Sequence, residues 1–350
     1  MAPNTKRVFY VRYLSSPLYA EILAKWPDVQ LDQLENESPP HEADPIMAMA
    51  HVYQIGASRQ ALAPPMHVTA DLLAKTPNLI AASSNGAGYD TIDVDACTAA
   101  GIVVVNQSGG NKEGVAEHAL AMMLTLSKRI VEADRDLRAG KEISRGAFTG
   151  RELNNRTLGV LGIGNVGSRV AELCRGLFHM RVLAFDPLQT AEQVKARGAE
   201  KVDLDTLLRE SDFVSVHCPL TRDSRKMMDA RAFGLMKPDA YFVTTARGFI
   251  HDETALANAL TNRQIAGAGL DVWEDEPPHS SHPLMKFDNV LVTPHTAGAT
   301  VESRENMSRF AAEQVLDILD GKRPPRLINP EVWPAYRERF GRIMGFSPVA

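Results

Sequence analysis

The chain has 350 residues, which predicts two domains at about 150 residues each. Hydrophobic residues make up 44% and charged residues 23%, a composition typical of a folded protein with a sizeable core and not of a disordered tail. The net charge of −5 disfavours binding to nucleic acid or to an anionic lipid surface. The sequence has no apolar run long enough to predict a membrane span and no signal-peptide core. Its three cysteines lie far apart, in no metal-ligand spacing. We therefore expect a soluble, cytoplasmic protein without a metal site or disulfide framework.

The first hundred residues alternate short apolar runs with helical patterns. Strands are predicted at Val8–Tyr13, His51–Ile55, Leu79–Ser83 and Ile102–Val105. Helices are predicted at Leu18–Lys25, Ala70–Ala74 and Val94–Ala100. Strands separated by helices predict a parallel sheet with crossover connections.

The middle of the chain opens with a long helical pattern over Lys112–Leu137, and the Gly- and Arg-rich segment Gly140–Asn155 is predicted as an exposed arm. Six strands follow at Thr157–Ile163, Arg181–Asp186, Phe213–His217, Tyr241–Thr245, Gly267–Leu270 and Val290–Thr293. With helices between most of them, they predict a doubly wound sheet. Val301–Leu319 predicts one more helix, and the tail from Lys322 is Pro-rich.

A strand–turn–helix segment carries the clearest motif. The turn reads Gly162-Ile163-Gly164-Asn165-Val166-Gly167, directly after the strand at Leu158–Leu161 and before a helical pattern at Ser168–Leu177. In such a turn the first glycine allows the tight bend, the second lets the backbone approach a pyrophosphate, and the third allows helix and strand to pack closely. Unpaired N–H groups at the helix start then face the phosphates. The motif alone would also fit a flexible loop.

The next strand strengthens this interpretation because it ends at Asp186, nineteen residues after Gly167. A carboxylate there accepts hydrogen bonds from a ribose hydroxyl and repels a 2′-phosphate. The following residues, Pro187–Thr190, include no Arg or Lys that could hold that phosphate. The pattern predicts a dinucleotide site that prefers NAD to NADP.

Reactive side chains follow four later strands, in the segments His217–Thr221, Thr245–Gly248, Asp271–Pro277 and Pro294–Gly298. Ligands of doubly wound sheets bind beyond these strand ends. An Arg can bind a carboxylate and polarise a carbonyl, and a His can exchange a hydroxyl proton near neutral pH. A neighbouring carboxylate favours the charged imidazolium. Taken singly, each residue would also fit a structural histidine or a surface ion pair.

In combination these motifs resemble the D-isomer-specific 2-hydroxyacid dehydrogenase family, in the branch of phosphoglycerate dehydrogenase-like enzymes. The similarity covers about Ile46 to Leu319. It is carried by Gly86-Ala87-Gly88-Tyr89-Asp90, Val115-Ala116-Glu117, Leu158–Gly167, His217–Thr221, Thr245–Gly248, Leu270–Pro277 and Thr293–Thr300.

The resemblance implies a role for individual residues. It implies a catalytic triad of Arg247, Glu276 and His295. It places the substrate carboxylate on Arg247 and on backbone amides of Gly86, Ala87 and Gly88. It also implies an NAD site lined by Gly162, Gly164, Asn165, Val166, Gly167, Asp186, His217, Pro219, Thr245, Asp271 and Gly298, with Asp271 at the nicotinamide carboxamide. Hydride would pass between NAD(H) and C2 of a 2-hydroxy or 2-keto acid, while His295, paired with Glu276, exchanges the oxygen-bound proton.

The resemblance also implies an α/β fold of two doubly wound parallel-sheet domains. A Rossmann NAD-binding domain, residues 107–295, would be inserted into a flavodoxin-like substrate-binding domain made of residues 1–106 and 296–350. The helical pattern at Lys112–Leu137 and the arm Gly140–Asn155 would form the interface of a homodimer.

Two alternative functions remain open on the sequence. A D-3-phosphoglycerate dehydrogenase of serine biosynthesis would need cations for a phosphate, and Arg59 is the candidate. An NAD-sensing corepressor-like scaffold would share the fold and would need no turnover. Formate dehydrogenase is disfavoured because its family pattern has Gln in place of Glu276.

Other conspicuous residues have simpler interpretations. His279 and His282 form an HxxH pattern in a Pro- and Ser-rich loop without a third ligand, so a solvated loop is favoured over a metal site. His118 is predicted to be a packing or interface residue, and Cys218 to have no chemical role.

Overall fold

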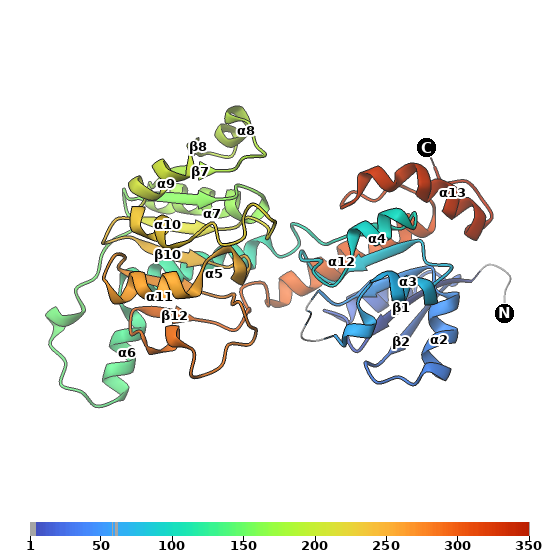
Figure 1. Cartoon of the computed structure of the whole chain (residues 1–350), viewed down its shortest axis with the longest axis horizontal. Helices are drawn as coiled ribbons and strands as arrows, with labels where there is room; N and C mark the ends of the chain where they lie inside the picture. Colours follow the sequence, from blue (N-terminus) through green and yellow to red (C-terminus); the bar gives the residue numbers. More distant parts are fainter. Residues whose placement is uncertain (1–4, 58, 60–61, 350) are drawn as a thin grey trace. The chain divides into compact units, whose positions relative to one another are not determined.

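The computed structural model describes residues 5–57, 59 and 62–349. It divides into two compact units (Figure 1). Unit 1 comprises Met1–Asn111 and Thr300–Ala350, and unit 2 comprises Lys112–Ala299. Both crossings between the units lie a few residues later along the chain than the boundaries expected from the sequence.

Unit 1 is built on a five-stranded, fully parallel sheet with the order β2-β1-β3-β4-β5. Its strands are β1 (Lys6–Val11), β2 (Val29–Leu34), β3 (Val52–Ile55), β4 (Ala81–Ser84) and β5 (Val103–Val105). The strands β3, β4 and β5 are buried along their whole length, and apart from Gln54 of β3 their residues are small or apolar. The order is that of a flavodoxin-like doubly wound sheet.

Helices cover both faces of this sheet. They are α1 (Leu18–Leu23), α2 (Pro40–Met49), α3 (Ala70–Lys75), α4 (Val94–Ala99), α12 (Val301–Leu319) and α13 (Trp333–Met344), with short 3-10 helices η1 (Pro64–Met66) and η5 (Pro330–Val332). The helices α1, α12 and α13 pack with one apolar cluster of the sheet, and α2, α3 and α4 with the other. The carboxyl ends of the strands therefore remain open between the two helical layers.

Three elements of unit 1 were missed in the sequence. The edge strand β2 has no continuous apolar run because most of its residues are only half-buried. The helices α2 and α13 both have a proline in their first turn. A proline suits the start of a helix, but the prolines of these segments favoured the interpretation of connecting loops. In α13, Tyr336 and Phe340 are buried and anchor the tail to unit 1.

Unit 2 contains a seven-stranded parallel sheet with the order β12-β11-β10-β9-β6-β7-β8. Its strands are β6 (Thr157–Leu161), β7 (Arg181–Phe185), β8 (Glu200–Lys201), β9 (Phe213–Val216), β10 (Tyr241–Thr244), β11 (Gly267–Leu270) and β12 (Val290–Val292). The strand order reverses between β6 and β9, which is the position where such sheets bind ligands. The six expected strands are present, and the two-residue edge strand β8 is the seventh.

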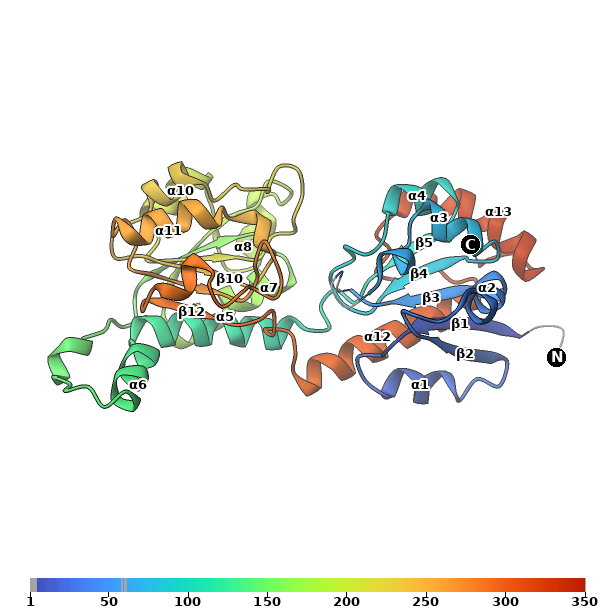
Figure 2. The same cartoon turned by 60° about the horizontal axis from the view of Figure 1, so that its bottom comes forward.

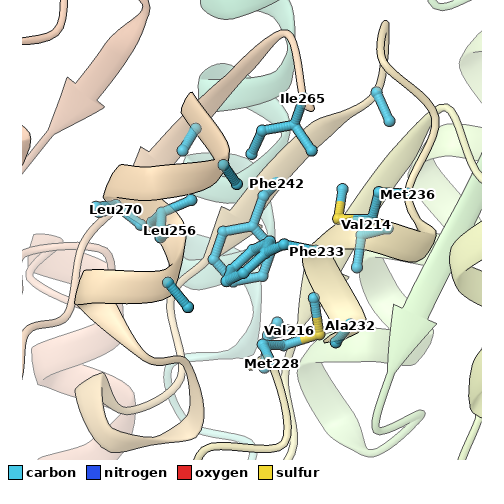
Figure 3. Packing of buried hydrophobic residues seen from close by; sticks show 14 of the residues in the cluster. Val214, Val216, Met228, Ala232, Phe233, Met236, Phe242, Leu256, Ile265 and Leu270 are labelled. Carbon is cyan, nitrogen blue, oxygen red and sulfur yellow. The ribbon is translucent and has the colours of Figure 1, made fainter. Parts of the chain in front are cut away.

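The helices of unit 2 are α5 (Lys112–Ser127), α6 (Ile130–Arg138), α7 (Asn165–Phe178), α8 (Ala191–Ala196), α9 (Leu204–Glu210), α10 (Ala230–Leu235) and α11 (Glu253–Thr261), with η2 (Arg145–Phe148), η3 (Gly248–Ile250) and η4 (Pro283–Lys286). On one face of the sheet, Phe233 of α10 and Phe242 of β10 meet edge to face, with ring centres 5.2 Å apart (Figure 3). The helices α5 and α7 cover the other face. Both faces are thus buried, and the reactive residues are left at the strand ends.

The single helix expected over Lys112–Leu137 is wrong. The structure breaks it at Arg129, whose φ of 53° is left-handed and ends an α-helix, so that α5 and α6 are separate. The helix α6 and the following loop with η2 extend from unit 2 as an arm (Figures 1 and 2). Within the described part of the chain, no helix combines the length and apolarity needed to span a membrane.

Candidate active site

The turn between β6 and α7 has the close contacts that demand glycine. Gly162 has a φ of 87°, and a Cβ there would lie 2.7 Å from the backbone of Cys218. A Cβ on Gly167 would lie 2.1 Å from the Gly162 carbonyl oxygen. A Cβ on Gly164, by contrast, would meet no described atom within 4 Å, and no side chain caps α7 at this residue. The first turn of α7 is therefore open to a phosphate group, flanked by Asn165 and Val166.

Asp186 lies at the end of β7 and is half-buried beside this turn. Its Oδ2 accepts a hydrogen bond from the Ile163 N–H at 3.1 Å, and its Oδ1 accepts one from the Leu188 N–H at 3.0 Å. Since a carboxylate has further lone pairs, it can still accept from a ribose hydroxyl. The structure also adds a cation that the sequence did not suggest: the Arg197 guanidinium donates to the Ile163 carbonyl oxygen. An arginine thus contacts the same residue of the turn as Asp186.

Three further predicted cofactor residues lie at the ends of neighbouring strands. His217 follows β9, and its Nε2 and Nδ1 lie 2.8 Å from Ser215 Oγ and 3.5 Å from Thr245 Oγ1, respectively. Burial lowers the pKa of His217 to about 3, so this imidazole is neutral at physiological pH. Thr245 is buried after β10, whereas Pro219 is exposed. These positions fit a role in contacting a ligand and do not fit proton transfer by His217.

Cys218 lies against Gly162 and shows no sign of reactivity. Burial raises the pKa of its thiol to about 11, so the reactive thiolate is scarce at neutral pH.

His295 and Glu276 form a close pair. His295 Nδ1 lies 2.7 Å from Glu276 Oε2, and Glu276 Oε1 accepts a hydrogen bond from the Trp273 N–H at 3.1 Å. The His295 side chain is 41% exposed, and within the described part of the chain its Nε2 has no hydrogen-bond partner. Burial opposes ionisation of Glu276, but the hydrogen bond and charge of His295 outweigh it and lower the pKa of this carboxyl. The pair therefore presents one imidazole nitrogen to a ligand and keeps a carboxylate behind the other.

Arg247 follows β10 and is held near this pair by its neighbour. A Cβ on Gly248 would lie 1.9 Å from the Trp273 carbonyl group, so the Arg247 loop packs directly on the loop that carries Glu276. The guanidinium is half-buried, donates to the Ala246 carbonyl oxygen at 2.6 Å, and its charge contributes to the lowered pKa of Glu276. The structure thus brings together the three residues of the expected triad.

Asp271 fixes the turn that carries His295. His295 has a left-handed φ of 55°, and its N–H donates to the Asp271 carbonyl oxygen at 2.7 Å. The next two N–H groups, of Thr296 and Ala297, donate to Asp271 Oδ1 and Oδ2 at 2.7 and 2.9 Å. Because Asp271 is fully buried and binds three successive amides, it holds His295 in a strained conformation. Its contact with a nicotinamide stays a prediction, as does that of the half-buried Gly298.

His118 is more than a packing residue. Its Nε2 lies 3.1 Å from Thr293 Oγ1, and that hydroxyl donates to Asp271 Oδ1 at 2.6 Å. His118 therefore supports Asp271 from α5. This pairing could not be predicted from a local sequence pattern because His118 and Thr293 are 175 positions apart.

The two histidines of the HxxH pattern have separate partners. His279 Nδ1 bonds to Ser281 Oγ at 2.7 Å, whereas His282 Nε2 lies 3.0 Å from Glu253 Oε2. Glu253 Oε1 accepts from the Glu274 N–H at 2.8 Å, so Glu253 anchors the loop just before Glu276. Among the described residues, no group of three His, Cys, Asp or Glu side chains is placed to hold a metal ion.

The turn Gly86–Gly88 follows β4 at the open edge of the unit 1 sheet. Gly86 is buried, and Ala87 and Gly88 are half-buried. Nearby, Arg59 donates through Nε to the Asp90 carbonyl oxygen at 2.6 Å.

A pocket of about 340 Å³ in unit 2 lies away from all these residues. It is lined by Leu126, Arg129, Glu132, Pro238, Tyr241, Arg263, Ile265, Ala266 and Asn289. Tyr241 begins β10 and Ala266 precedes β11, so this pocket belongs to the opposite edge of the sheet.

Comparison with known proteins decides the family. Residues 120–297 match the NAD binding domain of the D-isomer specific 2-hydroxyacid dehydrogenases. The glyoxylate reductase of Aeropyrum pernix is 39% identical over 93% of this chain and 96% of its own length. The chain belongs to the D-isomer specific 2-hydroxyacid dehydrogenase family. The expected family, the pair of parallel-sheet domains and the NAD-binding domain are thereby confirmed, and the protein is an oxidoreductase of this family.

Two other relatives define the breadth of the similarity. The D-3-phosphoglycerate dehydrogenase of Archaeoglobus fulgidus is 41% identical over 81% of this dehydrogenase, which spans only 53% of that longer relative. The solved D-lactate dehydrogenase of Aquifex aeolicus, complexed with NAD and lactic acid, has 30% identity and a TM-score of 0.76. That match covers 92% of this chain and 98% of the lactate dehydrogenase.

Proposed function

We propose that this dehydrogenase interconverts a small 2-keto acid and its D-2-hydroxy acid with NAD(H), and that glyoxylate is the first substrate to test. The observation that carries this proposal is the His295–Glu276 pair next to Arg247 at the open edge of the unit 2 sheet. The full-length similarity to a glyoxylate reductase supports the choice of substrate. In this proposal unit 2 holds the cofactor and unit 1 contributes to substrate binding.

Each residue of the triad has a distinct task. Glu276 holds Nδ1 of His295, so that Nε2 carries the proton that is exchanged with the substrate oxygen. The negative charge of Glu276 stabilises the imidazolium needed for reduction. Arg247 binds the substrate carboxylate in a forked geometry and polarises the carbonyl group. NADH, when bound, supplies the hydride to C2.

The glycine turn and Asp186 fit NAD, and they give a prediction on cofactor choice. Asp186→Ala should weaken NAD binding by about 1.5–3 kcal/mol, since a charge-assisted hydrogen bond to the ribose is lost. Use of NADP should rise, because the repulsion of a 2′-phosphate disappears while Arg197 stays beside the turn. Titration of NADH and NADPH by fluorescence, together with kcat/KM for both, measures the change.

Asp186→Asn is the control for this variant. It can still accept from the Ile163 N–H but carries no charge, so it separates charge repulsion from support of the turn. Equal use of NAD and NADP by the unmodified protein would contradict the role of Asp186.

A D-3-phosphoglycerate dehydrogenase activity is the second candidate. Arg59 favours it, because its guanidinium lies beside the residues that follow the Gly86–Gly88 turn. A screen of NADH oxidation with glyoxylate, pyruvate, hydroxypyruvate and phosphohydroxypyruvate distinguishes the two. Preference for the phosphorylated acid, abolished in Arg59→Ala, would establish the second candidate. NADH binding without turnover of any 2-keto acid would instead favour a scaffold protein.

We also propose a homodimer formed through the arm of unit 2. The helix α6 buries none of its residues, and the apolar side chains of Ile130, Leu137 and Ile143 on the arm are exposed. Exposed apolar surface on a projecting arm favours association. Light scattering at micromolar concentration should give twice the chain mass, and Leu137→Asp should lower it. A monomeric unmodified protein would contradict the proposal.

We place the protein in the cytoplasm. Its three cysteines, Cys97, Cys174 and Cys218, are free thiols, which suits a reducing compartment.

A further inference from the structure

In the turn Gly86–Gly88, each of the three carbonyl oxygens accepts a hydrogen bond from another group of unit 1. The Gly86 oxygen accepts from the Gln107 N–H at 2.8 Å. The Ala87 oxygen accepts from Asn106 Nδ2 at 2.7 Å, and the Gly88 oxygen accepts from the Ser84 hydroxyl. Three successive peptide oxygens are thus directed towards the protein interior.

The N–H groups of the same three residues are different. Within the part of the chain that the structure describes, no group accepts a hydrogen bond from the N–H of Gly86, Ala87 or Gly88, nor from that of Tyr89, which shares a peptide group with the Gly88 carbonyl. The side chains of the turn are no larger than a methyl group, so nothing of their own prevents a ligand from approaching these amides. A turn whose carbonyl groups are hydrogen-bonded and whose N–H groups have no acceptor in the described residues can bind an anion.

The residues that donate hydrogen bonds to these carbonyl oxygens are buried and belong to a larger hydrogen-bond network. Ser84, Asn106 and Gln107 are buried. The Gln107 side chain donates to the Ser84 carbonyl oxygen at 3.0 Å and accepts from Gln314 Nε2 at 2.9 Å. Gln314 Nε2 also donates to the Asn106 carbonyl oxygen at 3.0 Å. The network therefore connects β4, the start of the 106–108 segment and α12 within unit 1.

We propose that Asn106 and Ser84 are positioning residues: Asn106 holds the Ala87–Gly88 peptide and Ser84 holds the Gly88–Tyr89 peptide, so that the N–H groups of Gly88 and Tyr89 bind the substrate carboxylate. This inference rests on the proposed function, because it takes a 2-keto or 2-hydroxy acid as the anion. The physical reason is the planarity of the peptide group, in which C=O and N–H point in opposite directions. Fixing the carbonyl oxygen of one residue therefore fixes the N–H of the next residue in the chain. A rotated peptide would turn a carbonyl dipole towards the carboxylate and repel it.

Neither residue is expected to touch the reacting atoms, so the effect should appear in substrate binding. Ser84→Ala should raise KM for the 2-keto acid and the inhibition constant of oxamate, an unreactive carboxylate analogue, by the same factor of roughly 3- to 10-fold. The dissociation constant of NADH, measured by fluorescence without substrate, should stay unchanged. The value of kcat should change less than KM.

Ser83→Ala is the matched control, because Ser83 is an equally buried serine of the same strand that contacts Gln107 Nε2 and none of the three turn carbonyls. It should leave the oxamate constant within about twofold of the unmodified value. Asn106→Asp is the second variant. It keeps the shape of the side chain but replaces the group that donates to the Ala87 carbonyl oxygen by a charged acceptor. It should weaken the binding of oxamate more than Ser84→Ala does.

The outcomes separate this inference from the proposed function. If the unmodified enzyme neither reduces 2-keto acids nor binds oxamate, the proposed function fails. If it does both, and Ser84→Ala and Asn106→Asp bind oxamate as tightly as Ser83→Ala does, the positioning role is overturned. Weakened NADH binding in the folded Ser84→Ala variant would overturn it as well, since it would show a general structural effect.

Discussion

Replacement of His295 by alanine is expected to lower kcat for 2-keto acid reduction by roughly 10²- to 10⁴-fold at every pH, the usual contribution of a positioned general acid. The structure offers no substitute at this position: His217 is held neutral by a pKa of about 3, and Glu276 lies behind the imidazole at Nδ1. Because the His295 side chain is partly exposed, its loss should change neither the melting temperature nor NADH affinity substantially.

His279→Ala is the control for this variant, since that histidine is exposed and its side chain forms hydrogen bonds to Ser281 in its own loop. Steady-state kinetics of both variants, with NADH fluorescence titration, make the comparison. If His295→Ala retains turnover close to that of His279→Ala, the transferred proton comes from another group.

Arg247→Ala is expected to have an effect of similar size, but on a different kinetic parameter. Loss of a half-buried guanidinium that binds a carboxylate costs about 2–5 kcal/mol, so kcat/KM should fall by roughly thirtyfold to several thousandfold. Arg247→Lys should recover only part of this loss, because an ammonium group keeps the charge but not the fork. Oxamate binding should weaken in both variants.

Arg225 provides the matched control for Arg247. Its guanidinium lies 4.3 Å from the centre of the ring of Phe249, and Phe249 follows Arg247 by two residues in the chain. Arg225→Ala should retain kcat/KM within a few-fold. Unchanged oxamate affinity in Arg247→Ala would show that this arginine does not bind the substrate carboxylate.

Much of the fold could be predicted because the central strands are buried on both faces. Strands such as β6 and β10 are mostly apolar, and the helices between them have regular spacing. The edge strand β2 is only partly buried and the edge strand β8 is exposed, so their sequences lack that pattern. The end of α5 before Arg129 could not be predicted because arginine favours helices. Only the left-handed backbone conformation of Arg129 in the structure shows that the helix ends there.

Some residues of the candidate site could likewise be predicted from the sequence, and others could not. Residues in short motifs, such as Gly162, Asp186 and the triad, could be named from sequence because spacing and resemblance identify them. The supporting residues could not, because each acts on a partner far along the chain. Arg197 contacts Ile163 over 34 positions, and Glu253 pairs with His282 over 29. No local pattern distinguishes such residues from ordinary surface charges.

The most direct test of the proposed chemistry is the pH dependence of Glu276→Gln in both reaction directions. Glutamine keeps the shape and a hydrogen bond to His295 but removes the charge that stabilises the imidazolium. Reduction needs the protonated imidazole and oxidation the neutral one. The alkaline limit of reduction and the acid limit of oxidation should therefore both move to lower pH than in the unmodified enzyme. If both limits stay in place, Glu276 is not the functional partner of His295, and the proposed acid–base pair is wrong.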